Sequence, residues 1–265
     1  MADADTVMEV EDLVADYATQ RVLDGVNFSV RRGEIMVVMG GSGSGKSTLL
    51  RHLLGLNTPS RGSVRILGQD LTRMRPRELY RLRRNIGVSF QGGALFNSMS
   101  VGANVELPLR EHTRLDDNTI RIMARMKLEV VNMGGFEHLM PAQLSGGMVK
   151  RAALARAIVM DPQLLFFDEP SAGLDPVVSA ELDELILRLR RAMNMTIVVV
   201  THELESAFKI ADRITVLDHG EVLLSGTVDA IRGSDNQRVQ DLLNRRVGSV
   251  EMDAEDYLAR LTAEG

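Results

Sequence analysis

The sequence predicts an α/β fold in which a mainly parallel β-sheet is covered by helices on both faces. Short apolar runs, long enough for buried strands, occur at 34–39, 164–167 and 196–200. Between the last two runs, hydrophobic residues recur at the spacing of one helix face. Buried strands that alternate with helices are typical of parallel sheets, because the connecting helices cover both faces.

Antiparallel strands are predicted near the N-terminus. Residues 7–14 and 22–30 alternate apolar and polar side chains, as half-exposed strands do. Another strand is predicted at 64–67, after the turn-forming stretch TPSRG.

Helical patterns replace the β pattern from about residue 92 to 160, with turns expected at Pro108, Gly134–Gly135 and Pro141. Residues 213–226 predict a hairpin that turns at His219–Gly220. The helix expected before residue 196 buries one face, formed by Leu182, Leu185, Ile186, Leu189 and Met193.

Composition excludes several classes of protein. The chain has 265 residues and no cysteine, which excludes disulfides and thiolate metal sites. Its net charge of −5 gives no general attraction to nucleic acid or to an anionic membrane. The first ten residues lack the apolar core of a signal peptide, and no stretch approaches the ~18 apolar residues of a membrane span. We therefore expect a cytosolic or peripheral protein.

One segment departs from this acidic balance. Residues 73–84 contain six arginines. A run of this kind is usually a solvated helix face, and the alternative is contact with lipid headgroups or a partner.

The stretch GGSGSGKST, residues 40–48, predicts a phosphate-binding loop between a strand and a helix. Its glycines let backbone N–H groups point at phosphate oxygens, and the helix N-terminus adds its dipole. We expect Lys46 to reach the β- and γ-phosphates and the Ser47 hydroxyl to ligate Mg²⁺. The whole loop is assigned to the nucleotide: Gly40, Gly41, Ser42, Gly43, Ser44, Gly45, Lys46, Ser47 and Thr48.

Two carboxylates follow the second apolar run, in LLFFDEP at 164–170. A buried strand would bring Asp168 and Glu169 to the carboxyl end of the sheet, beside the phosphate loop. Asp168 is predicted to join the Mg²⁺ shell, and Glu169 to polarise the attacking water. Alone, such a pair is more often a helix cap or a surface pair, so the assignment depends on the phosphate loop.

With these motifs the chain resembles the ATP-binding cassette family over about residues 7–230. The resemblance implies a RecA-like P-loop NTPase core, an antiparallel β subdomain and a helical subdomain over about 92–160. It implies catalytic roles beside Glu169 for Gln91, which senses Mg²⁺ and the γ-phosphate, and for His202, the switch histidine. Three further motifs match in order: Tyr17 for stacking on adenine, the signature LSGGM at 144–148, and the interface loop SAGLD at 171–175 with Asp175.

The signature implies a partner. By the resemblance, Ser145 and the amides of Gly146 and Gly147 bind the γ-phosphate held by a second cassette, so that two ATP molecules join a head-to-tail dimer. A serine followed by a Gly-Gly turn at a helix N-terminus is also a physically reasonable anion site. The resemblance further implies an integral-membrane permease, because the chain has no predicted span.

Met148 stands where the family most often has glutamine, and the phosphate-binding serine and glycines are unchanged. The stretches 144–158 and 90–113 are similar to the branch that serves Mce/Mla-type phospholipid systems, which maintain outer-membrane lipid asymmetry. The predicted function is therefore a Mg²⁺-dependent ATP hydrolase, peripheral at the cytoplasmic face of the inner membrane, that powers phospholipid transport. Expected partners include a small regulatory subunit and a lipid-binding Mce-type subunit.

Two alternatives remain open. A cassette of this kind could serve another cargo, such as an amino acid, an ion or a lipoprotein. A cassette ATPase of DNA repair or translation is a different class, but such proteins usually carry coiled-coil insertions or two cassettes. The acidic charge also argues against a nucleic-acid partner.

Two interaction segments are predicted. An apolar strip at 92–109 is expected to receive a short permease helix, and its residues are Leu95, Phe96, Met99, Val101 and Val105. The cassette is expected to cover 7–235. Residues 236–265 lie beyond it and are predicted to form either a frayed terminus or an interaction tail. Two apolar helix faces are possible there, one with Val239, Leu242 and Leu243 and one with Tyr257, Leu258 and Leu261.

Overall fold

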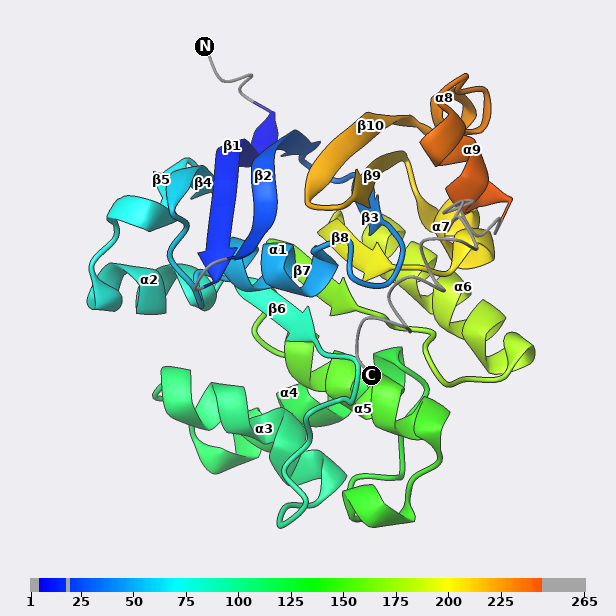
Figure 1. Ribbon diagram of the computed structural model, residues 1–265. Coiled ribbons are helices and arrows are strands. Elements are labelled where there is room, and N and C mark those ends of the chain that lie inside the picture. Colours follow the sequence, from blue (N-terminus) through cyan, green and yellow to red (C-terminus); the bar gives the residue numbers. More distant parts are fainter. Residues whose placement is uncertain (1–4, 18–19, 245–265) are drawn as a thin grey trace, which may run out of the picture.

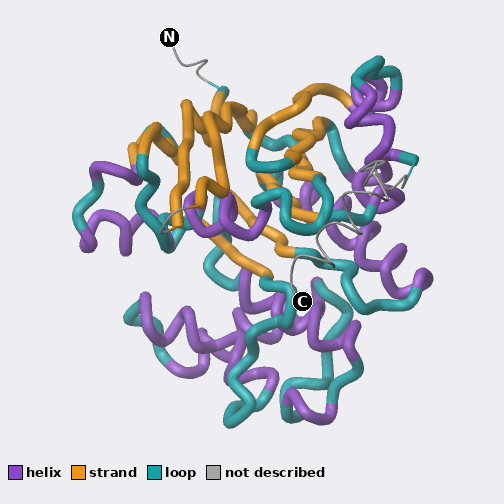
Figure 2. The backbone as a smooth tube through the Cα atoms, viewed as in Figure 1, coloured by secondary structure: helices purple, strands orange, loops and turns teal. Residues whose placement is uncertain are grey.

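The computed structural model describes residues 5–17 and 20–244. Its strands form two sheets in the upper half of Figures 1 and 2. The first sheet has the order β2-β1-β4-β5, with β1 (Thr6–Tyr17), β2 (Gln20–Arg31), β4 (Arg61–Ile66) and β5 (Gln69–Asp70). The second has the order β10-β9-β3-β8-β7-β6, with β3 (Ile35–Met39), β6 (Ile86–Ser89), β7 (Leu164–Asp168), β8 (Thr196–Thr201), β9 (Arg213–Asp218) and β10 (Glu221–Thr227).

The second sheet is parallel from β9 to β6, and β10 adds an antiparallel edge. Every residue of β3 is buried, because alternate side chains enter two separate hydrophobic cores. Ile35, Val37 and Met39 face one core, and Met36 and Val38 face the other. The predicted buried strands at 34–39, 164–167 and 196–200 are confirmed, and the fold is α/β as expected.

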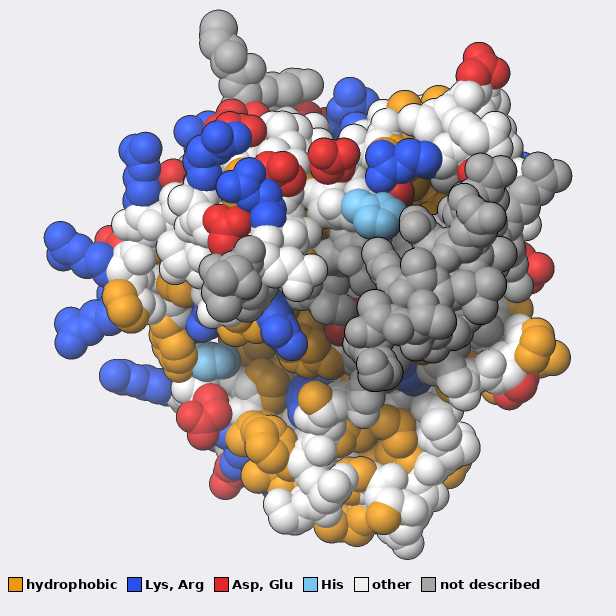
Figure 3. Space-filling view, viewed as in Figure 1, with side chains coloured by type: hydrophobic (Ala, Val, Ile, Leu, Met, Phe, Trp, Pro, Cys, Tyr) orange, Lys and Arg blue, Asp and Glu red, His pale blue; other side chains and the backbone are white. Residues whose placement is uncertain are grey.

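One core lies between the two sheets and contains the apolar face of α1 (Lys46–Leu53). The other is covered by helices, three of which form the lower part of Figure 1. These three are α3 (Val101–His112), α4 (Asp117–Val130) and α5 (Gly146–Ile158). They fall within the range predicted for a helical subdomain, and hydrophobic side chains reach the surface of this lower part of the molecule (Figure 3). The other helices are α2 (Pro76–Arg83), α6 (Pro176–Met193), α7 (Leu204–Ile210), α8 (Val228–Arg232) and α9 (Gln237–Leu243).

The turn predicted at Pro108 is wrong, because Pro108 lies inside α3. The ring costs the helix one backbone hydrogen bond. Burial of Val101, Val105 and Leu109 on the same helix holds both sides of the proline in place. Packing therefore overrides the local preference against helix at this position.

The hairpin at 213–226 is confirmed. His219 and Gly220 have φ of 46° and 83°, so both residues of the turn are left-handed, as a tight two-residue hairpin requires. The α6 face is also confirmed: Leu182, Leu185, Ile186 and Leu189 are buried.

Of the two apolar faces predicted after residue 236, only the first can be compared with the structure. Val239 on α9 is buried, and Leu242 and Leu243 pack against the core of their own chain. Tyr257, Leu258 and Leu261 lie outside the described residues.

Candidate active site

The phosphate loop follows the buried strand β3 and turns into α1. Gly43 and Gly45 have φ of 77° and 102°, a backbone conformation that side chains disfavour. A Cβ at Gly40 would lie 2.2 Å from the Leu217 carbonyl oxygen, so no larger residue fits there without a backbone shift. The buried Ser44 hydroxyl has no hydrogen-bond partner among the described residues. An inward-facing polar atom without a partner is what a bound phosphate oxygen would satisfy.

Lys46 is the first residue of α1 and is buried. Its Nζ donates to the carbonyl oxygens of Gly40 at 2.8 Å and Gly41 at 2.7 Å. Burial lowers the pKa of Lys46, and the charges of Glu169 and Asp168 oppose that shift. The lysine therefore lies with its ammonium inside the loop, and its contact with the β- and γ-phosphates stays a prediction.

The structure brings Glu169 and His202 together from the ends of β7 and β8. The Thr201 hydroxyl donates to Glu169 Oε2 at 3.0 Å, and the His202 N–H donates to the same oxygen at 3.3 Å. His202 Nδ1 lies 2.9 Å from Oε1, and the carboxylate identifies this nitrogen as the protonated one. Glu169 itself has φ of 46°, a left-handed conformation that is uncommon for a residue with a side chain.

Asp168 ends β7 and is half-buried. Burial and the neighbouring charge of Glu169 raise its pKa, while Lys150, Lys46 and Arg51 lower it. No hydrogen bond reaches its carboxylate from any residue that the structure describes. A divalent cation would supply the missing compensation, and the carboxylate, the Ser47 hydroxyl and the Gln91 amide are oxygen donors that suit Mg²⁺.

Ser47 lies on the first turn of α1 with its side chain exposed, and Gln91 is exposed just after β6. The described residues contain no group of three His, Cys, Asp or Glu side chains that could hold a metal alone. That is compatible with Mg²⁺, which proteins usually hold with one or two carboxylates and substrate phosphates.

The signature turn opens α5. Ser145 is the N-cap, and its hydroxyl accepts the Met148 N–H at 3.3 Å. A Cβ at Gly147 would lie 2.7 Å from Val178 Cγ1 on α6, which explains the glycine. The Met148 side chain packs against the helical core, so its departure from glutamine leaves the turn itself unchanged.

Two other predicted nucleotide contacts lie at element ends. Asp175 caps α6: its carboxylate accepts the N–H groups of Val177 at 3.1 Å and Val178 at 3.0 Å. Tyr17 is the last residue of β1, opposite Gln20. Its stacking on adenine stays a prediction.

Sequence reasoning missed Lys150 and Arg156, both on α5. The Lys150 ammonium donates to the main-chain oxygens of Gln91 and Glu169. The only signal for it was a cation within the small apolar residues of VKRAALA. From the sequence alone a lysine at this position is expected to be solvated. The structure shows that it is buried.

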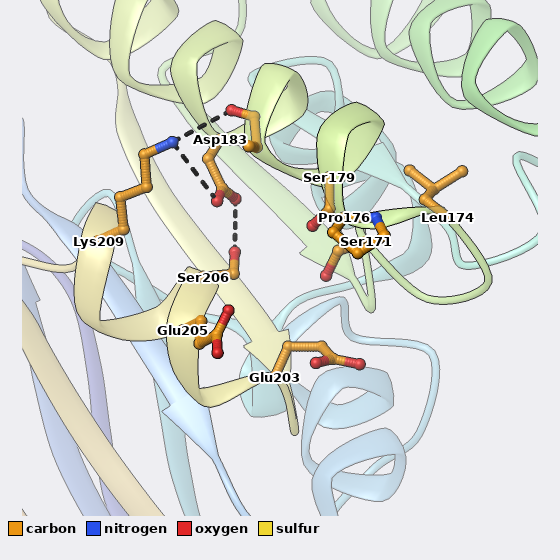
Figure 4. A pocket seen from close by; sticks show the side chains of 10 residues that line it. Ser171, Leu174, Pro176, Ser179, Asp183, Glu203, Glu205, Ser206 and Lys209 are labelled. Carbon is orange, nitrogen blue, oxygen red and sulfur yellow. Dashed lines mark hydrogen bonds and ion pairs between the residues drawn. The ribbon is translucent and has the colours of Figure 1, made fainter.

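A half-open cavity of about 240 Å³ lies beside the 171–175 loop (Figure 4). The Ser171 hydroxyl is buried there without a hydrogen-bond partner in the described part of the chain. At the other end, the Ser206 hydroxyl donates to Asp183, and Lys209 lies 3.9 Å from the same carboxylate. This cavity borders the predicted interface loop.

The fold and this site define a P-loop ATPase, with a phosphate loop, a carboxylate pair and a serine-glycine-glycine turn on separate elements. Residues 23–172 match the family model described as ABC transporter. The chain belongs to the ABC transporter family and is an ATP hydrolase of that type. No helix in the described ranges is long and apolar enough to cross a membrane.

Named relatives extend the match over nearly the whole chain. The sequence is 42% identical to the intermembrane phospholipid transport system ATP-binding protein MlaF of Haemophilus influenzae, over 96% of this chain and 98% of that protein. It is 41% identical to the probable ribonucleotide transport ATP-binding protein mkl of Mycobacterium leprae, over 94% of this chain and 72% of that protein. Among solved structures, a dimeric ATP-binding cassette in a post-hydrolysis state, bound to ADP and Pi, has a TM-score of 0.77. It is 31% identical and covers 83% of this chain and 98% of its own.

Proposed function

We propose that this chain powers phospholipid transport as the Mg²⁺-dependent ATPase subunit of an Mce/Mla-type system. The observation that carries the ATPase site is the buried Lys46 ammonium inside the phosphate loop, with Asp168 and Glu169 at the carboxyl end of β7 in the same parallel sheet. The charges of both carboxylates act on the pKa of Lys46. The cargo rests on the similarity to MlaF, which runs the length of both proteins.

In the proposed mechanism Lys46 leaves the Gly40 and Gly41 carbonyls and binds the β- and γ-phosphates. Ser47, Asp168 and Gln91 would hold Mg²⁺, which would supply positive charge to offset the negative charge of the phosphates.

Glu169 polarises the attacking water. Its carboxylate has about four acceptor positions, and three of them take Thr201 and His202 donors. One position on Oε1 remains for water. Glu169→Gln is expected to bind Mg·ATP and to lose about 10²–10⁴-fold in turnover. Near-normal phosphate release would contradict the assignment.

A dimer completes each site in this proposal. The turn at Ser145–Gly147 binds the γ-phosphate held by the partner's loop, and the related cassette that was solved as a dimer supports this arrangement. The 171–175 loop, with Asp175, lies between the two sites.

Mixing two inactive variants tests the dimer. A Glu169→Gln chain keeps its turn, and a Ser145→Arg chain keeps its carboxylate. If the turn acts on the partner's nucleotide, a mixed dimer has one complete site, and an equal mixture recovers up to about a quarter of wild-type hydrolysis in a two-fold assembly. If the turn acted on its own chain's nucleotide, the mixture would stay as inactive as each variant.

The permease is proposed to dock in an apolar groove lined in part by Phe90, the residue that precedes Gln91 in the chain. A cavity of about 160 Å³ is lined by Leu54, Leu56, Arg83, Ile86, Val88 and Phe90. Leu56 is 54% exposed, so a large apolar side chain faces solvent beside the sensor loop.

This groove differs from the strip predicted at 92–109. Val101 and Val105 of that strip are in the core, and Leu95 and Met99 are half-buried. Only Phe96 is exposed, and the Asn104 amide holds its backbone in place. The strip therefore mainly serves the helical core.

Leu56→Asp is expected to weaken recovery of the permease while ATP binding persists. Met126→Asp is the control, because Met126 is 61% exposed on α4, away from this groove. Equal permease recovery with both variants would exclude the groove.

In this proposal the cassette extends over 7–235, and its helical subdomain covers about 92–160. The protein lies at the cytoplasmic face of the inner membrane, as a peripheral subunit.

The two named relatives differ in the cargo that their names state. The match covers 98% of the length of MlaF but 72% of the length of mkl, and this favours phospholipid as the cargo. The complex purified from its native membrane should carry phospholipid, detected by lipid mass spectrometry, together with permease, regulatory and Mce-type subunits. Stimulation of its ATPase by ribonucleotides, amino acids or ions, with no bound lipid, would refute the cargo and leave the ATPase intact.

A further inference from the structure

Lys150 connects the helix that starts at the signature turn with the hydrolytic site of its own chain. It is 7% exposed, and its Nζ donates to Glu169 O at 3.1 Å and to Gln91 O. Burial lowers its pKa, and the charges of Asp168 and Glu169 act in the opposite direction. A buried ammonium needs acceptors, and here two backbone carbonyls provide them.

Both carbonyls belong to residues whose backbone directs a functional side chain. Glu169 lies in the left-handed region, and its N–H is fixed by Val200 O at 2.8 Å. Lys150 holds the carbonyl at the other side of the same residue. Strained backbone persists only where surrounding contacts determine it, so this lysine is part of what aims the Glu169 carboxylate.

The same helix also holds the loop that follows Gln91. Arg156 donates to Gly93 O at 2.9 Å and to Ala94 O at 2.8 Å. Two cations six residues apart on α5 thus bind three carbonyl oxygens of this segment, those of Gln91, Gly93 and Ala94. A shift of α5 would move the loop and Glu169 together.

We propose that Lys150 is a positioning residue that aligns Glu169 and Gln91 of its own chain with α5, whose first turn binds the partner's nucleotide. The inference rests on the proposed dimer. Each α5 then joins two sites, the partner's through Ser145 and its own through Lys150, so that binding at the partner's site adds to the alignment that Lys150 already gives the carboxylate of its own chain.

The mixture of Glu169→Gln and Ser145→Arg chains gives a directional test. Its one working site uses the carboxylate of the Ser145→Arg chain and the turn of the Glu169→Gln chain. Lys150→Met is added first to one chain and then to the other. Methionine has a similar length and no donors, so it removes the two contacts without leaving a large gap.

We expect Lys150→Met in the Ser145→Arg chain to lower the restored hydrolysis about 10–100-fold, the effect of a small misplacement of a reacting group. In the Glu169→Gln chain the same substitution should have at least a tenfold smaller effect, since that chain has no catalytic carboxylate left to align. ATP affinity should stay within about threefold in both placements, because the loss is in positioning and not in binding.

Lys127→Met is the matched control. Lys127 is also mostly buried in the helical region and pairs with Asp161, but it contacts no residue of the site. Its substitution should leave the restored rate unchanged in either chain.

Equal losses in both placements, or a greater loss in the Glu169→Gln chain, would overturn the assignment, because a general structural role or damage to the signature turn gives those results. If the mixture without Lys150→Met restores no hydrolysis, the proposed dimer is wrong. The single Lys150→Met chain should also have a lower Hill coefficient for ATP than wild type. A wild-type coefficient of one would refute the coupling.

Discussion

Thr201→Val tests whether the Glu169 carboxylate is held as a charged group. Thr201 is 1% exposed, and its hydroxyl donates to Glu169 Oε2 and accepts the Glu203 N–H, both at 3.0 Å. Valine has nearly the same shape, so the change removes these hydrogen bonds without a cavity. A hydrogen bond to a charged group contributes about 1.5–3 kcal/mol and a neutral one about 1. The expected loss in the free energy of unfolding is therefore about 2.5–4 kcal/mol.

Thr215→Val is the matched control in the same sheet, on β9, which β3 separates from the strand of Thr201. Thr215 is fully buried, and its hydroxyl lies 2.9 Å from Ser225 Oγ, a neutral partner. Its loss should cost about 1 kcal/mol.

Thermal unfolding without nucleotide compares the two variants. About 2.5–4 kcal/mol corresponds to a Tm lower by about 5–16 °C in a domain of this size, and the control should fall by about 2–4 °C. Thr201→Val should also reduce turnover about tenfold, through a less fixed carboxylate. A Tm for Thr201→Val equal to that of Thr215→Val would refute the charge-assisted bond.

Three further results are expected. Met148→Gln should keep the ATPase within about tenfold, because the Met148 side chain packs on the core, whereas Ser145→Arg should abolish it; equal damage in a phosphate-release assay would contradict this. Burial raises the pKa of Asp183 above its ordinary 3.8, against the opposing Ser206 hydroxyl, so its contribution to stability is full below that value and is lost as pH rises through the raised pKa. Asp183→Asn should therefore gain stability relative to wild type as pH rises from 4 to 8 in urea unfolding, and a pH-independent difference would refute the shift. Chelation of Mg²⁺ by EDTA should stop phosphate release and leave an ATP-bound fraction detectable by filter binding; undiminished release would refute the metal role of Asp168.

The strands that were predicted well are those whose burial is complete on both faces. In β3, β7 and β8 a run of apolar residues is required by two cores at once, so the signal is strong. The predicted bounds of β4 differ from the observed ones. The strand begins at Arg61, three residues before the predicted 64–67, and ends at Ile66. Leu67 has φ of 51°, and this left-handed conformation ends the strand. Leucine does not favour such a conformation, so its presence in the sequence did not predict a turn.

The strand β6 escaped prediction because it is short and half-exposed. Its glycine, Gly87, would meet the Ala157 carbonyl oxygen at 2.4 Å if it had a Cβ. That requirement comes from α5, far along the chain, and no local pattern of IGVS reveals it. The phosphate loop and the pair Asp168–Glu169 were predictable because their chemistry is local to one turn. The contacts of Lys150 were not, because they join segments 59 and 19 residues away.

Because the chain has few lysines, chemical labelling of amines can report on individual sites of the protein. Most of the 31 basic side chains are arginines, and the four lysines are Lys46, Lys127, Lys150 and Lys209. Two of them, Lys46 and Lys150, are buried in the hydrolytic site, and their lowered pKa values enlarge the uncharged fraction of each amine, which is the fraction that a reagent can acylate. An amine-directed reagent followed by mass spectrometry would therefore report the nucleotide state at Lys46 and the position of α5 at Lys150, with Lys127 and Lys209 in the same digest as internal references.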